Sequence, residues 1–295
     1  MVRTAPRPRP VASGINAKLT PARRAPVVAY WLSSGLVALL VVASAAGLFV
    51  PGLYHDTPDW VAQAQATDLV TLVVVVPTLI TVMILAARGS ISARIVWLGI
   101  LGYAVYMFAI YSFDVAFNGL FLVYVAALSL AAWCLATLLT QLNPDDARPR
   151  DEARTLVRAV AVYLLMVSAL FVLTWMKDIV PALVTHTAPL SLAHIRQLTN
   201  PVEVLDLSFL LPLATLASVW LWRRASWGYP LAGMALTIMT VVGVSVVVDA
   251  GFEHHINPTL SLAIVPLFAV VTLVGLGLLA GYVRTFQPEA PRGQR

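Results

Sequence analysis

The chain has 295 residues, of which 60% are hydrophobic and only 11% are charged, and its formal net charge is +5. Soluble domains carry about 25% charged residues, so this composition excludes an ordinary soluble protein. Runs of about 20 apolar residues recur along the chain, and that length is what a helix needs to cross a bilayer.

Eight apolar runs are predicted to be transmembrane α-helices, because lipid cannot satisfy exposed backbone polar groups. In chain order they cover residues 28–50, 67–87, 95–113, 120–141, 156–176, 202–222, 228–249 and 260–282. The expected fold class is therefore an all-α, polytopic helical membrane protein.

The remaining segments divide the chain into tails, loops and two membrane units. Residues 1–26 hold six basic residues and five prolines without apolar periodicity, which predicts a disordered basic tail. Two four-helix units are expected at 27–142 and 155–285, joined by an inner loop at 143–154 and followed by a tail at 286–295. A cleaved signal peptide ending at the "ASA" of Ala43–Ala45 is an alternative, although the apolar run exceeds the usual core of about 7–15 residues.

The basic residues predict the orientation. With the N-terminus inside, all of the 19 Lys and Arg residues except Lys177 and Arg196 fall in inner segments. This bias follows the positive-inside rule and predicts a cell (inner) membrane protein with both termini in the cytoplasm. The lipid bilayer is the expected partner. Nucleic-acid binding is not supported, because the basic residues are scattered over five inner segments.

The two halves of the chain repeat a pattern in the same order. "VPGL" at Val50–Leu53 matches "VPAL" at Val180–Leu183, the acids Asp68 and Asp206 open the next spans, and prolines and a basic turn follow. The third and seventh spans end in "DVAFN" and "DAGFEHHIN", and matched positions lie 130 to 139 residues apart. This order predicts duplication of a four-helix unit, with parallel repeats because each unit has an even number of spans.

One stretch carries a resemblance to known proteins. "NPVEVLDLSFLLP" at Asn200–Pro212, followed by "LWRRASWGYPLAG" at Leu221–Gly233, resembles a group of uncharacterised multi-pass membrane proteins of bacteria. The resemblance covers about the last third of the chain well. It implies a helical membrane fold and no particular activity.

Two carboxylates near the start of the sixth span have different predicted roles. Asn200 and Pro201 suit the N-cap and first helical position, and Glu203 completes a capping box. Asp206 lies five residues beyond Pro201, about 7–8 Å along the helix, which is beyond capping reach. An ionisable group at that depth should face the bundle interior or a wet cavity, so Asp206 is the leading candidate for ligand or ion binding.

Further candidate site residues also fall at the outer ends of spans. Asp68 is proposed as the counterpart of Asp206, although it also suits a first-turn acid. Asp114 and Asp249 end their helices, where the helix dipole disfavours a negative charge and a partner is expected. His254 and His255 with Glu253 could bind a metal, but their spacing does not place two histidines on one helical face.

Several other residues can be interpreted as packing or anchoring residues, and some of them also as functional ones. Tyr103, Met107 and Tyr111 share one face of the third span with Asp114, a pattern that suits packing or a polar path. Thr57–Asp59 suggests a short surface helix with Trp60 as an interfacial anchor. Cys134 is expected to be a small packing residue. Gly277 and Gly281 predict a close helix contact within the protein or in a homo-oligomer.

The sequence therefore predicts an outward-opening acidic pocket inside a helical membrane protein. Transport or permeation of a cation, proton or small solute is the favoured function. A membrane-embedded, possibly metal-dependent enzyme acting on lipid is an alternative, as is an accessory or sensor subunit without chemistry of its own. No motif identifies a cofactor or a catalytic residue.

Overall fold

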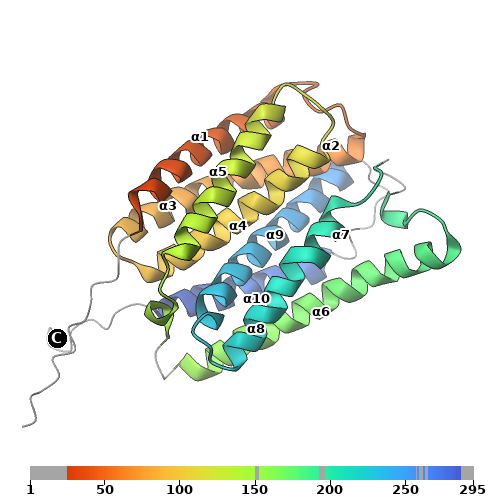
Figure 1. Cartoon of the computed structure of the whole chain (residues 1–295). Coiled ribbons are helices and arrows are strands. Elements are labelled where there is room, and N and C mark those ends of the chain that lie inside the picture. The colour runs from red at the N-terminus through yellow and green to blue at the C-terminus, as the bar shows by residue number, and fades with distance from the viewer. Residues whose placement is uncertain are drawn as a thin grey trace, which may run out of the picture.

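A computed structural model describes residues 25–149, 153–192, 197–256, 258, 262 and 265–286. The described part is helical throughout and contains no strand (Figure 1). Its elements are α1 (Val27–Phe49), α2 (Pro58–Val70), a π-helical turn (Thr71–Val75), α3 (Val76–Ala87), α4 (Ile91–Phe113), α5 (Phe121–Thr140), a 3₁₀ turn (Pro144–Ala147), α6 (Arg154–Thr185), a 3₁₀ turn (Leu190–Leu192), α7 (Pro201–Leu205), a π-helical turn (Asp206–Leu210), α8 (Leu211–Trp222), α9 (Gly228–Ile256) and α10 (Val265–Arg284). These form eight helical rods that are long and apolar enough to cross a membrane, which confirms the predicted fold class.

Helices α4 and α9 form the centre of the bundle. They lie side by side, with α1, α3 and α5 on one side and α6, α8 and α10 on the other (Figure 1). Glycines bring the two helices close, because a Cβ at Gly99 would lie 2.3 Å from Thr237 Cβ and a Cβ at Gly233 would lie 2.3 Å from Ile95 Cγ2. The part of the α4–α9 contact that holds Gly99 and Gly233 is therefore closely packed and leaves little space between the helices.

The outer helices turn large apolar side chains away from the protein. Examples from α5, α6, the second π-helical turn and α10 are Trp133, Leu173, Phe209 and Leu273, each about two-thirds exposed. In water such a surface would be strongly unfavourable, whereas in lipid it costs nothing. The described surface therefore suits a protein embedded in a bilayer.

The two groups of four rods have the same order of neighbours. In the first group α1 contacts α2, α3 contacts α4, α4 contacts α5, and α5 returns to α1. In the second group α6 contacts α8, α8 contacts α9, α9 contacts α10, and α10 returns to α6. This common order agrees with the predicted duplication, which nevertheless stays a prediction.

The π-helical turns give the two groups a common register. In each turn an N–H bonds to a carbonyl five residues back, Val76 to Thr71 and Leu211 to Asp206, and a proline follows at once. Pro77 and Pro212 are 135 residues apart, and so are Asp114 and Asp249. The same spacing pairs Asp68 with Glu203 rather than with Asp206, so the acid counterparts predicted from the sequence differ from the structural register.

Two predicted helix ends are wrong. The second span begins at Pro58 rather than residue 67, and Trp60, expected as a surface anchor, is buried. The fifth span continues to Thr185 and includes Pro181, so the "VPAL" expected to follow the helix lies inside it. Tertiary neighbours cover the polar first turns of α2, and α6 extends past the apolar stretch that defined its predicted end.

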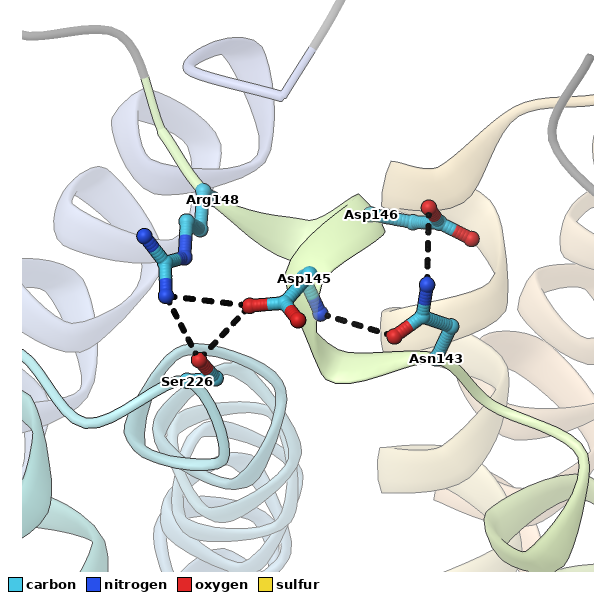
Figure 2. A network of polar contacts seen from close by, with 5 residues as sticks. All are labelled: Asn143, Asp145, Asp146, Arg148 and Ser226. Carbon is cyan, nitrogen blue, oxygen red and sulfur yellow. Dashed lines mark hydrogen bonds and ion pairs between the residues drawn. The ribbon is translucent and has the colours of Figure 1, made fainter. Parts of the chain in front are cut away.

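Residues after α5 join the two groups at the end of the bundle that holds Arg88, Arg148, Arg158 and Arg224, which we call the arginine-rich end. Polar contacts hold the first part of this segment. Figure 2 shows Arg148 Nη2 donating to Ser226 Oγ at 2.8 Å, and Ser226 Oγ donating to Asp145 Oδ1 at 2.7 Å. Asp145 also pairs with Arg148 at 3.0 Å, and Asn143 Oδ1 accepts the Asp145 N–H. Because these groups are exposed, the network orients the loop and adds little stability. The predicted tails at 1–26 and 286–295 lie almost wholly outside the described residues.

Two small-residue predictions have different outcomes. Cys134 is fully buried, and its Sγ lies 3.2 Å from Ser33 Oγ and donates to the Ala29 carbonyl at 3.4 Å. It is thus a packing residue between α1 and α5. Gly281 packs on Leu156 of α6, whereas a Cβ at Gly277 would meet no atom of the described residues within 4 Å. The Gly281 contact is within the chain.

Candidate acid-lined cavity

Three tyrosines of α4 connect the centre of the bundle to its neighbours. Tyr103 Oη lies 3.0 Å from Ser245 Oγ of α9, and Tyr106 Oη donates to Asp206 Oδ1 at 3.0 Å. Tyr111 Oη lies within hydrogen-bonding distance of two acceptors, the Ala64 carbonyl at 3.0 Å and Asp68 Oδ1 at 3.3 Å. All three rings are buried, so α4 supplies a polar ladder near the acid-rich end.

A cavity of about 90 Å³ lies beside this ladder, between α2, α4 and α9. A water occupies about 30 Å³ of liquid, so this space suits about three waters or one small organic ion. Its walls are mainly apolar and aromatic, and they include Trp60, Tyr103, Tyr106, Met107, Tyr111 and Val242.

Asp249 is the only acid among the described residues that line the cavity. Its Oδ1 atom is buried and makes no hydrogen bond with the described residues. Asp249 as a whole is half-buried, so the uncompensated desolvation falls on this one enclosed oxygen. Asp249 is therefore the predicted site residue whose surroundings most call for a ligand or a proton.

Asp68 occupies a closed pocket of its own, linked to the cavity through Tyr111. Its Oδ2 accepts from Tyr54 Oη at 2.6 Å, and a Cβ at Gly47 would lie only 1.9 Å from that same oxygen. Burial, and then the Asp68 charge, raise the pKa of Tyr54 far above its usual range, so Tyr54 stays protonated as a donor. The Asp68 carboxylate is thus fully engaged by hydrogen bonds.

Asp206 lies in the π-helical turn and lines a second, smaller cavity. It accepts from Tyr106 as described and from Trp175 Nε1 of α6 at 2.9 Å. The second cavity, of about 20 Å³, is bounded by α6, α8, α9 and α10, and Val242 lines both cavities. The two spaces are thus neighbours separated by the Val242 side chain.

Asp114 lines a separate depression on the protein surface. Together with His55, Asp56 and Gln197 it encloses about 940 Å³ there. Gln197 Nε2 donates to Asp114, and the Ala116 N–H donates to Asp56 Oδ1 at 3.0 Å. Burial, and then the neighbouring Asp56 charge, raise the pKa of Asp114 to about 6.

The residues proposed for a metal do not converge in the described structure. Glu253 accepts a hydrogen bond from Gln63 of α2, and His254 and His255 lie in the last turn of α9. Among the described residues no three His, Cys, Asp or Glu side chains come together as a metal-binding group. The metal site therefore has no geometric support in this part of the chain.

Glu203 lies where the capping interpretation places it. Asn200 Oδ1 accepts the N–H groups of Val202 and Glu203 at 3.0 and 3.3 Å, which is N-cap geometry. Glu203 Oε1 accepts from Asn200 Nδ2 at 3.1 Å, rather than from the backbone N–H of a standard capping box. Its role is to hold the cap.

Three partners of the acids were not predicted from the sequence. Tyr106 is three residues after Tyr103, a spacing that puts it near the same helical face, and this signal could have identified it. Tyr54 and Trp175 come from a turn and from α6, and no local pattern links either one to its aspartate. Only the fold brings them together.

Comparison of the chain with protein-family models, curated proteins and solved structures finds no match. The class that the fold defines is a multi-pass helical membrane protein with a buried, acid-lined cavity toward one end.

Proposed function

We propose that the protein binds a small organic ammonium ion in the cavity beside Asp249 and carries it across the membrane. The observation that carries this proposal is the Asp249 carboxylate, whose buried Oδ1 has no described hydrogen-bond partner in a cavity walled by aromatic rings. A monovalent cation there would compensate the charge that burial otherwise penalises.

The walls favour an alkylammonium ion over a metal ion. Calcium takes six to eight oxygen ligands and magnesium six, whereas a single carboxylate lines this space. Trp60, Tyr103, Tyr106 and Tyr111 instead bring four aromatic rings to the wall, and an alkylammonium group over a ring face is attracted by about 0.5–2 kcal/mol. The aliphatic part of the wall, which includes Ile110, Val242 and Val246, suits methyl groups.

Transport, rather than binding alone, is supported by the arrangement of the cavities. The surface depression with Asp114 lies at the same end of the bundle as the first cavity, and the second cavity with Asp206 lies nearer the arginine-rich end of α9. Closely packed residues of α4 and α9 close the way beyond them. A cavity with a wide surface depression at its own end of the bundle and close packing toward the other end is what a carrier has in one of its two states.

The binding step is tested with tetramethylammonium as the probe. Thermal melting of the purified full-length protein in detergent is measured with tetramethylammonium chloride or with sodium chloride at equal ionic strength. We expect stabilisation by tetramethylammonium alone and a loss of affinity of at least tenfold in Asp249→Asn. Asp178→Asn is the matched control, since it removes an equal charge at the same end of the bundle, where Asp178 accepts from Leu190 and Ser191 N–H groups. Equal stabilisation of wild type and Asp249→Asn would overturn the binding site.

The transport step is tested separately in proteoliposomes. Uptake of radiolabelled tetramethylammonium under an inside-negative potential is expected for wild type and Asp178→Asn, and not for Asp249→Asn. Binding without uptake would support the proposed binding site and overturn the proposed transport.

A further inference from the structure

A separate pocket, lined by arginines, lies at the arginine-rich end of the bundle, opposite the end that holds Asp68, Asp114 and Asp249. It has a volume of about 90 Å³ and lies between the first turns of α6 and the end of α8, which adjoin each other in Figure 1. Its lining includes Arg154, Arg158, Arg224 and Trp222. Three guanidinium groups thus share one small space.

Trp222 and Arg158 are already arranged for an anion. The Arg158 guanidinium carbon lies 5.8 Å from the centre of the Trp222 ring, a cation–π distance that restricts the guanidinium. A planar guanidinium held in this way can donate two parallel hydrogen bonds to a phosphate.

Arg224 occupies a backbone position that normally selects glycine. It ends α8 with φ +57°, and the Ala225 N–H bonds to the Trp220 carbonyl at 2.9 Å, as in a Schellman cap. The turn after α3 has the same bond, from Ser90 to Leu85 at 3.1 Å, and there the left-handed residue is Gly89 with φ +89°. Gly89 and Arg224 are 135 residues apart, the register of the π-helical turns. Arg224 therefore has a strained backbone where the matched turn has glycine, which adopts this conformation without strain. Strain of this kind indicates that the arginine side chain has a function.

The surface leading from the pocket is apolar. Leu165 and Met166 of α6 and Leu216 and Val219 of α8 are exposed along the two helices that form the pocket. These residues would contact acyl chains in a bilayer, while arginines near a membrane surface attract anionic headgroups. A ligand with a phosphate and a hydrocarbon tail matches both parts.

We propose that Arg154, Arg158 and Arg224 form a binding site for the phosphate of an anionic phospholipid, whose acyl chains lie along α6 and α8. This site is separate from the acid-lined cavity and does not depend on the function proposed for it. Free phosphate has the same headgroup chemistry, and the test distinguishes the two sources.

The test uses delipidated full-length protein in a neutral detergent. Melting temperature is followed during titration with phosphatidylglycerol, phosphatidylcholine or sodium phosphate. We expect phosphatidylglycerol to raise the melting temperature of wild type, with little effect of the other two. The variants Arg158→Gln and Arg224→Gly should each lower the apparent affinity for phosphatidylglycerol at least tenfold. Arg88→Gln, at the same end but outside the pocket, is the control and should respond as wild type does.

Arg224→Gly separates a binding role from a structural one. Glycine removes the strain of the left-handed backbone, so without lipid this variant should melt at or above the wild-type temperature while losing the lipid response. An Arg224→Gly variant that responds to phosphatidylglycerol as Arg88→Gln does would overturn the site. An equal response of wild type to sodium phosphate, or to phosphatidylcholine, would overturn its assignment to an anionic lipid.

Discussion

Gly47→Ala places a methyl group directly against the Asp68 carboxylate. The new Cβ would lie 1.9 Å from Asp68 Oδ2 and 2.5 Å from Tyr54 Oη, so both groups must move. Overpacking of this kind costs about 1–3 kcal/mol, and a hydrogen bond to a charged group is worth about 1.5–3 kcal/mol. The better helix propensity of alanine returns about 1 kcal/mol. We therefore expect the free energy of unfolding to fall by about 1.5–5 kcal/mol, on the sum of these effects.

Gly35→Ala in the same helix is the matched control. Its Cβ would lie 3.2 Å from Leu130 Cδ1, the end of a flexible side chain, so the change should stay within about 1 kcal/mol of wild type. Unfolding is followed by circular dichroism during titration with a denaturing detergent.

A double-mutant cycle isolates the proposed clash. If the cost arises at the carboxylate, Gly47→Ala should cost at least about 1 kcal/mol less in an Asp68→Ala background, because contacting residues couple by about 0.5–3 kcal/mol. The same stability for Gly47→Ala and Gly35→Ala, or strict additivity with Asp68→Ala, would refute the reasoning.

Two further predictions concern other acids. Asp206→Asn should destabilise the protein by about 1–3 kcal/mol, because the new NH₂ must face one of the two donors Tyr106 and Trp175. Glu203→Gln keeps its bond to Asn200, so its stability should stay within about 0.5 kcal/mol of wild type. Equal costs of the two variants in the detergent titration would contradict this. The folded pKa of Asp114 is raised from 3.8 to about 6, so its contribution to stability is full below about pH 4 and is lost as the pH rises through 6. The melting-temperature difference between wild type and Asp114→Asn should change across that window and be constant above pH 7, and a flat difference throughout would refute the shift.

The number of spans could be predicted from the sequence because the length of apolar runs reports directly on bilayer thickness. Helix ends were predicted less well. Trp60 and the polar turns around it lie outside the apolar run, yet α2 includes them because α9 covers that face. The extension of α6 was not predicted because Lys177 and Asp178 interrupt the apolar run and Pro181 suggests a helix end.

The candidate site was predicted in part. Depth along the helix identified Asp206 as a candidate, because charge inside a span is rare. Asp249 was identified because it ends its helix, where the helix dipole disfavours a negative charge. Their different states could not be predicted: Asp206 has two donors from α4 and α6, while Asp249 Oδ1 has no described partner. That difference arises from packing between distant helices, which one sequence does not encode in any local pattern.

The π-helical turns have a mechanical consequence. At each turn the regular ladder of hydrogen bonds is interrupted, and Pro77 and Pro212 lack the N–H that would restore it. Bending is therefore easiest at the same depth in both rods, next to a central α4–α9 pair that is closely packed toward the arginine-rich end. The helices before the turns, α2 with Asp68 and α7 with Glu203, would then bend relative to α3 and α8, which follow the turns. A carrier built in this way would change the access to its cavity by flexing two helices, without separating its two halves.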